Sequence, residues 1–263
     1  MPLPVPFGQF VPGDSPVHRL DPRVKIALAV AYTVVLFASR GWPGLGACAL
    51  VALGAIALSG VPWRLALRGI QPIAILLLIT LLINALAWRP PVAILRIGSL
   101  GISGSGLMTG LYFVVRIVLL VLGTSLLTLT TSPVALTDAL STLMRPLSRV
   151  GVPVDDVAMM FSIALRFIPT TAEEAEKIVV AQGARGARFD EGGPVKRARA
   201  WLPVLVPLFV NLFRRADDLA IAMESRCYTG VGRTRLAEQR MSAADWATLV
   251  VGVTVAAIAV ILL

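Results

Sequence analysis

Histidine and cysteine, on which many catalytic and metal sites depend, are almost absent from this sequence. Its 263 residues include one histidine, His18, and two cysteines, Cys48 and Cys227, which lie far apart. An HExxH zinc site needs two histidines and is excluded, and a histidine-based triad has a single candidate base. Two distant cysteines predict neither a disulfide framework nor a metal site. We therefore expect no cofactor and no metal to belong to the chain.

Charged residues are also scarce. They make up 15% of the chain, whereas an average soluble domain has about 25%. Apolar residues reach 57% and the mean hydropathy is +0.82, which would leave a soluble protein no place for its hydrophobic surface. The same composition excludes disordered, collagen-like and disulfide-scaffold proteins. The sequence thus predicts an integral membrane protein, whose net charge of +9 indicates basic loops beside an anionic lipid leaflet rather than a nucleic-acid partner.

Long uncharged runs locate the membrane spans, because a helix needs roughly 20 apolar residues to cross about 30 Å of hydrocarbon. The first residues are rich in proline and have no apolar core, so they are not expected to be a cleavable signal. Membrane-spanning strands are not expected either, because no segment shows the required alternation. The runs predict five transmembrane helices, near residues 24–40, 42–61, 66–88, 106–130 and 243–263.

The charges of the loops predict an orientation in the membrane. Basic residues precede the first span and separate the second span from the third; they are Arg19, Arg23, Lys25, Arg64 and Arg68. We therefore place these loops and the N-terminus in the cytoplasm, and five spans then place the C-terminus outside. The expected protein is a multi-pass protein of the cell membrane.

Residues 131–242 differ from the rest of the chain. They hold 12 of the 15 acidic residues and 15 of the 24 basic ones, so we place them mostly in water on the cytoplasmic side. Pro169 is expected to kink or interrupt the helix that contains it. Proline and glycine positions predict helices from Pro133 to about Arg145, from Pro153 to about Gly186, and from Val195 to about Tyr228. These helices are expected to lie along the membrane without forming a further span.

Two of these helices end alike, with a small residue, an arginine and another small residue. The endings are Ala184, Arg185 and Gly186 in one helix, and Ser225, Arg226 and Cys227 in the other. A helix C-terminus carries partial negative charge that stabilises a cation, and small neighbours let such a tip enter a narrow groove. The guanidinium can then bind a carboxylate through two parallel hydrogen bonds. A simpler interpretation, in which each arginine only caps the last carbonyls, stays open.

Further motifs follow one another along the chain: GQFVPGDS at 8–15, HRLDPR at 18–23, LTTSP at 129–133 and ALRFIP at 164–169. Together with the two tips they resemble the T component of energy-coupling factor transporters, a vitamin-uptake branch of the ABC transporters. The resemblance covers essentially the whole chain. Ala184–Gly186 matches the Ala-Arg-Gly signature of that family as it stands, whereas the second tip keeps only Arg226.

The resemblance implies an all-α membrane scaffold with about five transmembrane helices and three long cytoplasmic coupling helices, two of which cross as an X. The arginine tips would dock in grooves of two ATP-binding subunits, which bind the ATP, and a separate S component would bind the vitamin or metal. The chain itself would have no catalytic residue. It would divide into a cytoplasmic N-terminal segment (1–23), transmembrane helices 1–4 (24–130), a coupling-helix region (131–242) and transmembrane helix 5 (243–263).

Two other functions are weighed against this one. An ordinary ABC permease would line its own pathway and carry one short coupling loop, which the long 131–242 insert argues against. A multi-span membrane transferase would need clustered acidic residues, whereas the only Asp pairs, 155–156 and 217–218, suit solvated faces or helix starts. Substrate choice would belong to the S component, so this chain does not specify the substrate or the number of S components served.

Two further arginines have more than one interpretation. Arg116 lies inside the fourth span, where a charge is expensive and usually faces the helix bundle. It either bonds to Asn84 or to backbone carbonyls, or contacts the S component. Arg166 is expected to pair locally with Glu173 or Glu174.

Overall fold

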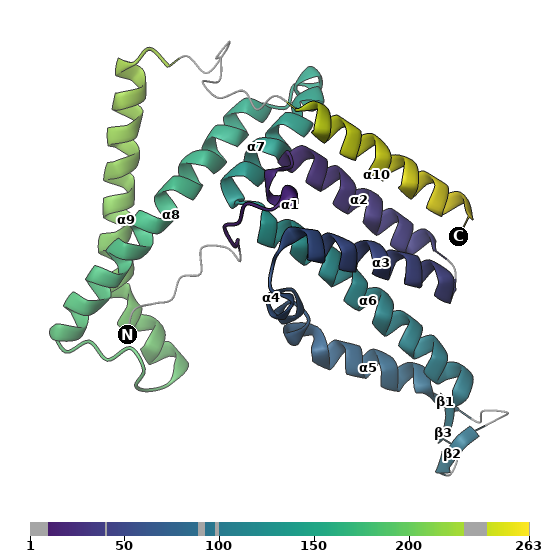
Figure 1. Ribbon diagram of the computed structural model, residues 1–263. Helices are drawn as coiled ribbons and strands as arrows, with labels where there is room; N and C mark the ends of the chain where they lie inside the picture. The colour runs from purple at the N-terminus through teal and green to yellow at the C-terminus, as the bar shows by residue number, and fades with distance from the viewer. Residues whose placement is uncertain (1–9, 40, 89–92, 98–99, 229–240, 263) are drawn as a thin grey trace. The chain divides into compact units, whose positions relative to one another are not determined.

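The computed structural model describes residues 10–39, 41–88, 93–97, 100–228 and 241–262. Of these residues, 10–139 and 241–262 form one compact unit, called the membrane unit, and 140–228 form another, called the helix-pair unit. The described chain is helical apart from one small sheet (Figure 1). The expected all-α membrane architecture is therefore confirmed.

Apolar helices build the membrane unit. Within the described ranges, three segments are long and apolar enough to cross a membrane: helix α3, helix α6, and the broken helix from Trp63 to Ala85. Helices α2 and α10 coincide with the two other predicted spans but are shorter as apolar segments, so their crossing stays a prediction. The helices of the unit are α1 (Pro16–Arg19), α2 (Pro22–Ala38), α3 (Trp42–Ser59), α4 (Trp63–Arg68), η1 (Gln71–Ile73), α5 (Ala74–Ala85), α6 (Gly104–Thr130) and α10 (Ala243–Leu262).

The third predicted span is not one continuous helix. It begins as α4, passes through the 3-10 turn η1 and continues as α5. Pro72 lies in η1, and a proline offers no amide hydrogen to the preceding turn of a helix, which explains the break. The predicted helix also continues to residue 88, whereas α5 ends at Ala85 and the next three residues form a strand.

A small antiparallel sheet connects α5 to α6. Its strands are β1 (Leu86–Trp88), β2 (Ala93–Ile97) and β3 (Leu100–Ser103), in the order β1-β3-β2. The sequence analysis did not predict it, because strands of three to five residues are too short to show a clear alternation of apolar and polar side chains.

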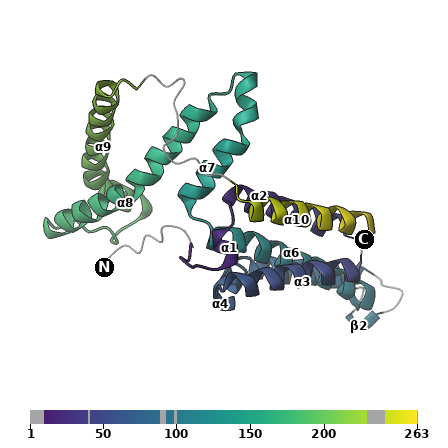
Figure 2. The ribbon, with the colours of Figure 1, turned by 45° about the horizontal axis from the view of Figure 1, so that its top comes forward.

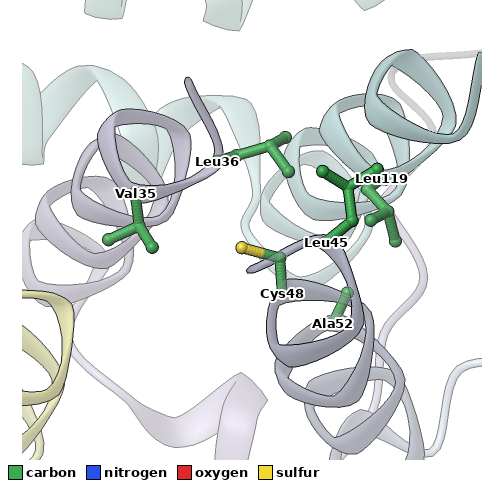
Figure 3. Close-up of a cluster of buried hydrophobic side chains, with 6 residues drawn as sticks. All are labelled: Val35, Leu36, Leu45, Cys48, Ala52 and Leu119. Atoms are coloured by element: carbon green, nitrogen blue, oxygen red, sulfur yellow. The ribbon is translucent and has the colours of Figure 1, made fainter. Parts of the chain in front are cut away.

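Helix α6 is central to the membrane unit and packs against α2, α3, α4 and α5, while α10 lies along α2 (Figures 1 and 2). One buried cluster joins α2, α3 and α6; it consists of Val35, Leu36, Leu45, Cys48, Ala52 and Leu119 (Figure 3). Both cysteines are free, Cys48 in this cluster and Cys227 on the surface, as predicted. Many outward-facing apolar side chains stay exposed, which suits helices that contact lipid.

A polar junction ties the HRLDPR motif to distant helices of the membrane unit. The Lys25 ammonium is buried and donates hydrogen bonds to the carbonyls of His18 (3.1 Å) and Thr130 (2.9 Å). The His18 ring in turn bonds the Val11 carbonyl (3.0 Å). Buried carbonyls and a buried ammonium satisfy one another here, so the motif fixes the N-terminal segment against the end of α6.

The helix-pair unit contains two long helices, α8 (Val154–Ala184) and α9 (Pro194–Ser225). The 3-10 helix η2 (Arg145–Val150) precedes α8, and α7 (Pro133–Leu143) leads into the unit. These bounds agree with the predicted helices to within a few residues. Pro169 lies inside an unbroken α8 and therefore does not interrupt it.

Candidate functional site

Helices α8 and α9 cross each other, as both views show (Figures 1 and 2). The start of each helix follows from local sequence. Asp155 and Asp156 lie in the first turn of α8, where carboxylates are stabilised by the helix dipole, and Pro194 opens α9 at a position that needs no amide donor. The crossing brings residues far apart in the sequence into contact.

Glu174 of α8 is the polar centre of the crossing. Its carboxylate accepts a hydrogen bond from the Arg215 guanidinium of α9 (3.2 Å) and another from the Asn211 side-chain amide. The same guanidinium lies over the Phe167 ring, 5.5 Å from its centroid. Because both partners of the ion pair are largely shielded from water, this contact is expected to stabilise the crossing more than an exposed pair would.

A second contact compensates for a proline. Pro207 has no amide hydrogen, so the carbonyl of Pro203, one turn earlier in α9, loses its usual donor. The side-chain amide of Gln182 on α8 donates to that carbonyl at 3.3 Å. The two prolines inside α9, Pro203 and Pro207, therefore create a polar contact with α8 instead of only loosening the helix.

The crossing lies at the same distance from both helix tips. Arg185 follows Glu174 by 11 residues, and Arg226 follows Arg215 by 11 residues. At 1.5 Å per residue, each tip lies roughly 16 Å along its helix from the ion pair. The 41-residue spacing of the two arginine tips is thus also the spacing of the ion pair that joins the two helices.

The tip of α8 is closed by a Schellman motif. The Gly186 amide donates to the carbonyl of Gly183 (2.9 Å), and the Ala187 amide donates to that of Gln182 (3.0 Å). Gly186 has a φ of +87°, the left-handed conformation that this motif requires. Arg185 is the last residue before the reversal and is exposed.

The tip of α9 has the same geometry. The Cys227 amide donates to the carbonyl of Glu224 (2.9 Å), and the Tyr228 amide donates to that of Met223 (3.0 Å). Cys227 occupies the position of Gly186, with a φ of +56°, and is the one residue other than glycine with positive φ in the described part of the chain. The departure from Ala-Arg-Gly at this tip therefore carries backbone strain in addition to the bulk of a thiol.

Both arginines lie at the equivalent cap position of their helices, on the outside of the protein. Arg185 and Arg226 are exposed, as are the flanking residues Ala184, Gly186, Ser225 and Cys227. A Cβ built on Gly186 meets no atom within 4 Å, so the space beside the first tip is open. Neither guanidinium forms an ion pair within the described ranges, and each is therefore available to an external carboxylate.

An open apolar groove of about 690 Å³ lies between the two helices. Small side chains from both helices line it: Ala172 and Ala175 from α8, Ala216 and Ala220 from α9. Larger apolar side chains complete the lining, among them Phe167 and Met223. Because the surface of this groove is almost entirely apolar, an apolar helix or segment could pack into it without burying polar groups.

Two expectations about individual arginines have different outcomes. Arg116 donates to the carbonyl of Ser39 (2.7 Å), which confirms a backbone-carbonyl partner, whereas Asn84 bonds Thr80 instead. Glu174, one of the two partners expected for Arg166, pairs with Arg215 of the other helix instead, so that expectation is wrong.

Three residues of the crossing were not predicted from the sequence: Arg215, Asn211 and Gln182. The 41-residue spacing of the two arginine tips, applied to Glu174, would have indicated Arg215. Within the described ranges, no three His, Cys, Asp or Glu side chains are placed to hold a metal ion.

The sequence is similar to those of known proteins. The profile of the CbiQ family, described as cobalt transport protein, matches residues 13–236. The energy-coupling factor transporter transmembrane protein EcfT of Thermosediminibacter oceani is 49% identical over 247 residues, 94% of this chain and 93% of that protein. The protein of the same name from Bacillus subtilis is 39% identical over 253 residues, 96% of both chains.

Proposed function

The chain belongs to the CbiQ family of cobalt transport proteins and is the transmembrane component of an energy-coupling factor transporter, and we propose that it couples ATP hydrolysis by two partner subunits to substrate uptake by a third. In this proposal the chain catalyses no reaction and binds no cofactor. The ATP-binding subunits hold the nucleotide, and a separate S component binds the vitamin or metal that is transported.

One observation carries the proposal: α8 and α9 present two arginines with the same cap geometry, at the same distance from the ion pair where the helices cross. Two equivalent tips suit two similar partners. Each guanidinium would enter a groove of one ATP-binding subunit and bind a carboxylate there through two hydrogen bonds.

The mechanism follows from this attachment. ATP binding would bring the two ATP-binding subunits together, and each tip would move with the subunit that holds it. The Glu174–Arg215 pair and the Gln182–Pro203 contact fasten the helices at and beside their crossing. Displacement of the tips would therefore change the angle between the parts of α8 and α9 that precede the crossing. The apolar groove between the helices would change width with that angle, and the S component would sense the change.

The proposed orientation places α8, α9 and the N-terminus in the cytoplasm. Cys227 is exposed at the second tip and Cys48 is buried, so the natural chain carries one reactive probe. In cells that make the chain without its ATP-binding subunits, which would cover the second tip, a membrane-impermeant maleimide should leave Cys227 unlabelled, and opening these cells should label it. A cysteine introduced at Gly101, in β3, should be labelled from outside. The reverse pattern would contradict the orientation.

Co-purification tests the composition of the complex. The tagged chain, expressed with the other membrane and ATPase genes of its source, should bring down ATP-binding subunits and a small membrane protein that binds the transported substrate. The chain purified alone should hydrolyse no ATP, and the complex should. If the chain purifies alone from cells that contain those partners and transports substrate by itself, the scaffold proposal is wrong and the permease alternative takes its place.

A further inference from the structure

Arg116 has an incomplete set of partners inside the membrane unit. Its Nη2 donates to the Ser39 carbonyl (2.7 Å) and to the Tyr112 hydroxyl (2.6 Å), and the guanidinium lies over the Tyr112 ring, 4.8 Å from its centroid. The buried Nε has no acceptor among the described residues. These contacts position the guanidinium, but all of them are with neutral groups.

Among the residues that the structure describes, no carboxylate forms an ion pair with Arg116. Residues 22–130, which include α2 to α6, contain neither aspartate nor glutamate. The described acidic residues of the membrane unit are Asp14, Asp21, Asp138 and Asp245. Asp14 precedes α1, Asp21 is the N-cap of α2, Asp138 lies in α7 and Asp245 lies in the first turn of α10, whereas Arg116 reaches Ser39, at the opposite end of α2. Burying a charge without a counter-charge costs free energy, and an arginine cannot avoid this cost by losing its proton, because it stays protonated in proteins. Within the described part of the membrane unit the guanidinium therefore has no counter-charge, and a group from outside the chain could supply one.

A hollow of about 590 Å³ lies beside Arg116 and can admit such a group. The Arg116 guanidinium is its polar donor, and Phe37, Trp42 and Met108 form apolar walls. The Thr109 and Tyr112 hydroxyls also line it, but they donate to the carbonyls of Ser105 (2.9 Å) and Ser39 (3.1 Å). Phe37 and Met108 are 59% and 61% exposed, and Trp42 is 46% exposed. The site thus combines cation and hydroxyl groups with a large exposed apolar surface.

The position of the hollow matches the boundary between hydrocarbon and headgroups. Ser39, the C-cap of α2, and Gly41, the N-cap of α3, line it, so it lies where these two predicted spans would leave the membrane. Trp42 and Tyr112 pack edge to face beside it, with their ring centroids 5.8 Å apart. Tryptophan and tyrosine are enriched at this depth of a bilayer, where phospholipid phosphates also lie.

We propose that the hollow beside Arg116 binds the phosphate of a phospholipid, with the lipid tails lying over Phe37 and Met108. The phosphodiester would accept hydrogen bonds from the guanidinium. A free inorganic phosphate would satisfy the charge equally, but the apolar walls would then stay exposed. The bound lipid would fasten the α2–α3 turn to α6, because Arg116 and Tyr112 both bond Ser39 of that turn.

The test uses the full-length chain, delipidated in detergent, and native mass spectrometry to count bound lipid. Dioctanoyl phosphatidylglycerol should bind at least tenfold more tightly than dioctanoylglycerol, which has the same tails and no phosphate. Inorganic phosphate at millimolar concentration should not displace the phospholipid. Equal binding of the two lipids would overturn the proposal, and displacement by inorganic phosphate would assign the site to a free anion.

Variants then locate the site. Arg116→Met should weaken phosphatidylglycerol binding about tenfold or more, since charge-assisted hydrogen bonds are lost, and Arg116→Lys should weaken it less. Arg64→Met is the matched control, because Arg64 also lies over an aromatic ring, that of Trp63, but outside the hollow; its affinity should equal that of the natural chain. Unchanged binding by Arg116→Met would overturn the proposal.

Two further experiments test the lipid assignment independently of the Arg116 variants. If Arg116→Met does not fold, the comparison of the two lipids and phosphate on the natural chain still decides. If the complete transporter, purified from membranes that contain phosphatidylglycerol, carries no such lipid while the isolated chain binds it, the counter-ion in the assembly is a partner's carboxylate and the lipid assignment is wrong.

Discussion

Asp21 and Asp245, which are 224 positions apart, share one hydrogen bond that joins the first and last long helices of the membrane unit. The backbone amide of Asp21 donates to one carboxylate oxygen of Asp245 at 3.1 Å. The other oxygen accepts from the amide and the hydroxyl of Ser242, and the Ser242 hydroxyl accepts from the Asp245 amide. One buried carboxylate thus completes a capping box on α10 and also holds the N-cap residue of α2.

Replacing Asp245 should therefore loosen both helix starts at once. Asp245→Ala leaves the buried Asp21 amide without its acceptor and removes the carboxylate half of the capping box of α10, so we expect the free energy of unfolding to fall by about 1–3 kcal/mol. The measurement is the thermal unfolding midpoint in detergent. Asp190→Ala, at an exposed position, is the control and should change the midpoint little. Equal midpoints for the two variants would show that the shared carboxylate does not stabilise the helix pair.

The geometry of the two helix tips predicts that two substitutions change the stability of the chain in opposite directions. Cys227→Gly should raise the stability of the chain by about 1 kcal/mol, because glycine adopts the left-handed conformation at φ +56° without steric strain. Gly186→Ala should lower it by about 1–2 kcal/mol for the same reason. The open space around Gly186 excludes a clash as the cause. Thermal unfolding of the two variants checks this, and a decrease on Cys227→Gly would contradict the strain at the second tip.

The Glu174–Arg215 pair should have a measurable coupling energy. A double-mutant cycle with Glu174→Gln and Arg215→Met should give about 1 kcal/mol of coupling in the unfolding free energy, since both side chains are less than a third exposed. The Arg188–Glu191 pair is the control; its side chains are 73% and 59% exposed, and its coupling should be close to zero. Similar coupling for both pairs would mean that the crossing owes little to this contact.

Periodicity and composition predicted the elements of the fold well. The long uncharged runs marked the positions of all five helices proposed as spans, and prolines and glycines marked α7, α8 and α9, because these signals lie within the segments themselves. The break at Pro72 and the sheet between α5 and α6 were missed. A proline in an apolar run and three short strands leave little signal in the sequence.

The contacts between distant segments were harder to predict. The S-x-x-D pattern at 242–245 could have identified the capping box, but nothing in it indicates that Asp245 also reaches Asp21. Arg166 is nearer to Glu174 in the sequence, yet Glu174 pairs with Arg215, because the crossing of α8 and α9 brings these two residues together. The arginine tips themselves were located from sequence, and their shared cap geometry became visible only in the structure.

Uptake by the complete transporter tests the coupling role of the two tips most directly. Substrate uptake into cells and ATPase activity of the purified complex are compared for Arg185→Ala, Arg226→Ala and the double variant, with Arg188→Ala as the control near the first tip. A docked guanidinium is partly desolvated, so each single variant should lose about 2–5 kcal/mol of the binding free energy to its ATP-binding subunit. Uptake should fall in both single variants and be abolished in the double variant, while Arg188→Ala transports normally. A double variant that assembles and transports like the natural chain would show that Arg185 and Arg226 are only helix caps.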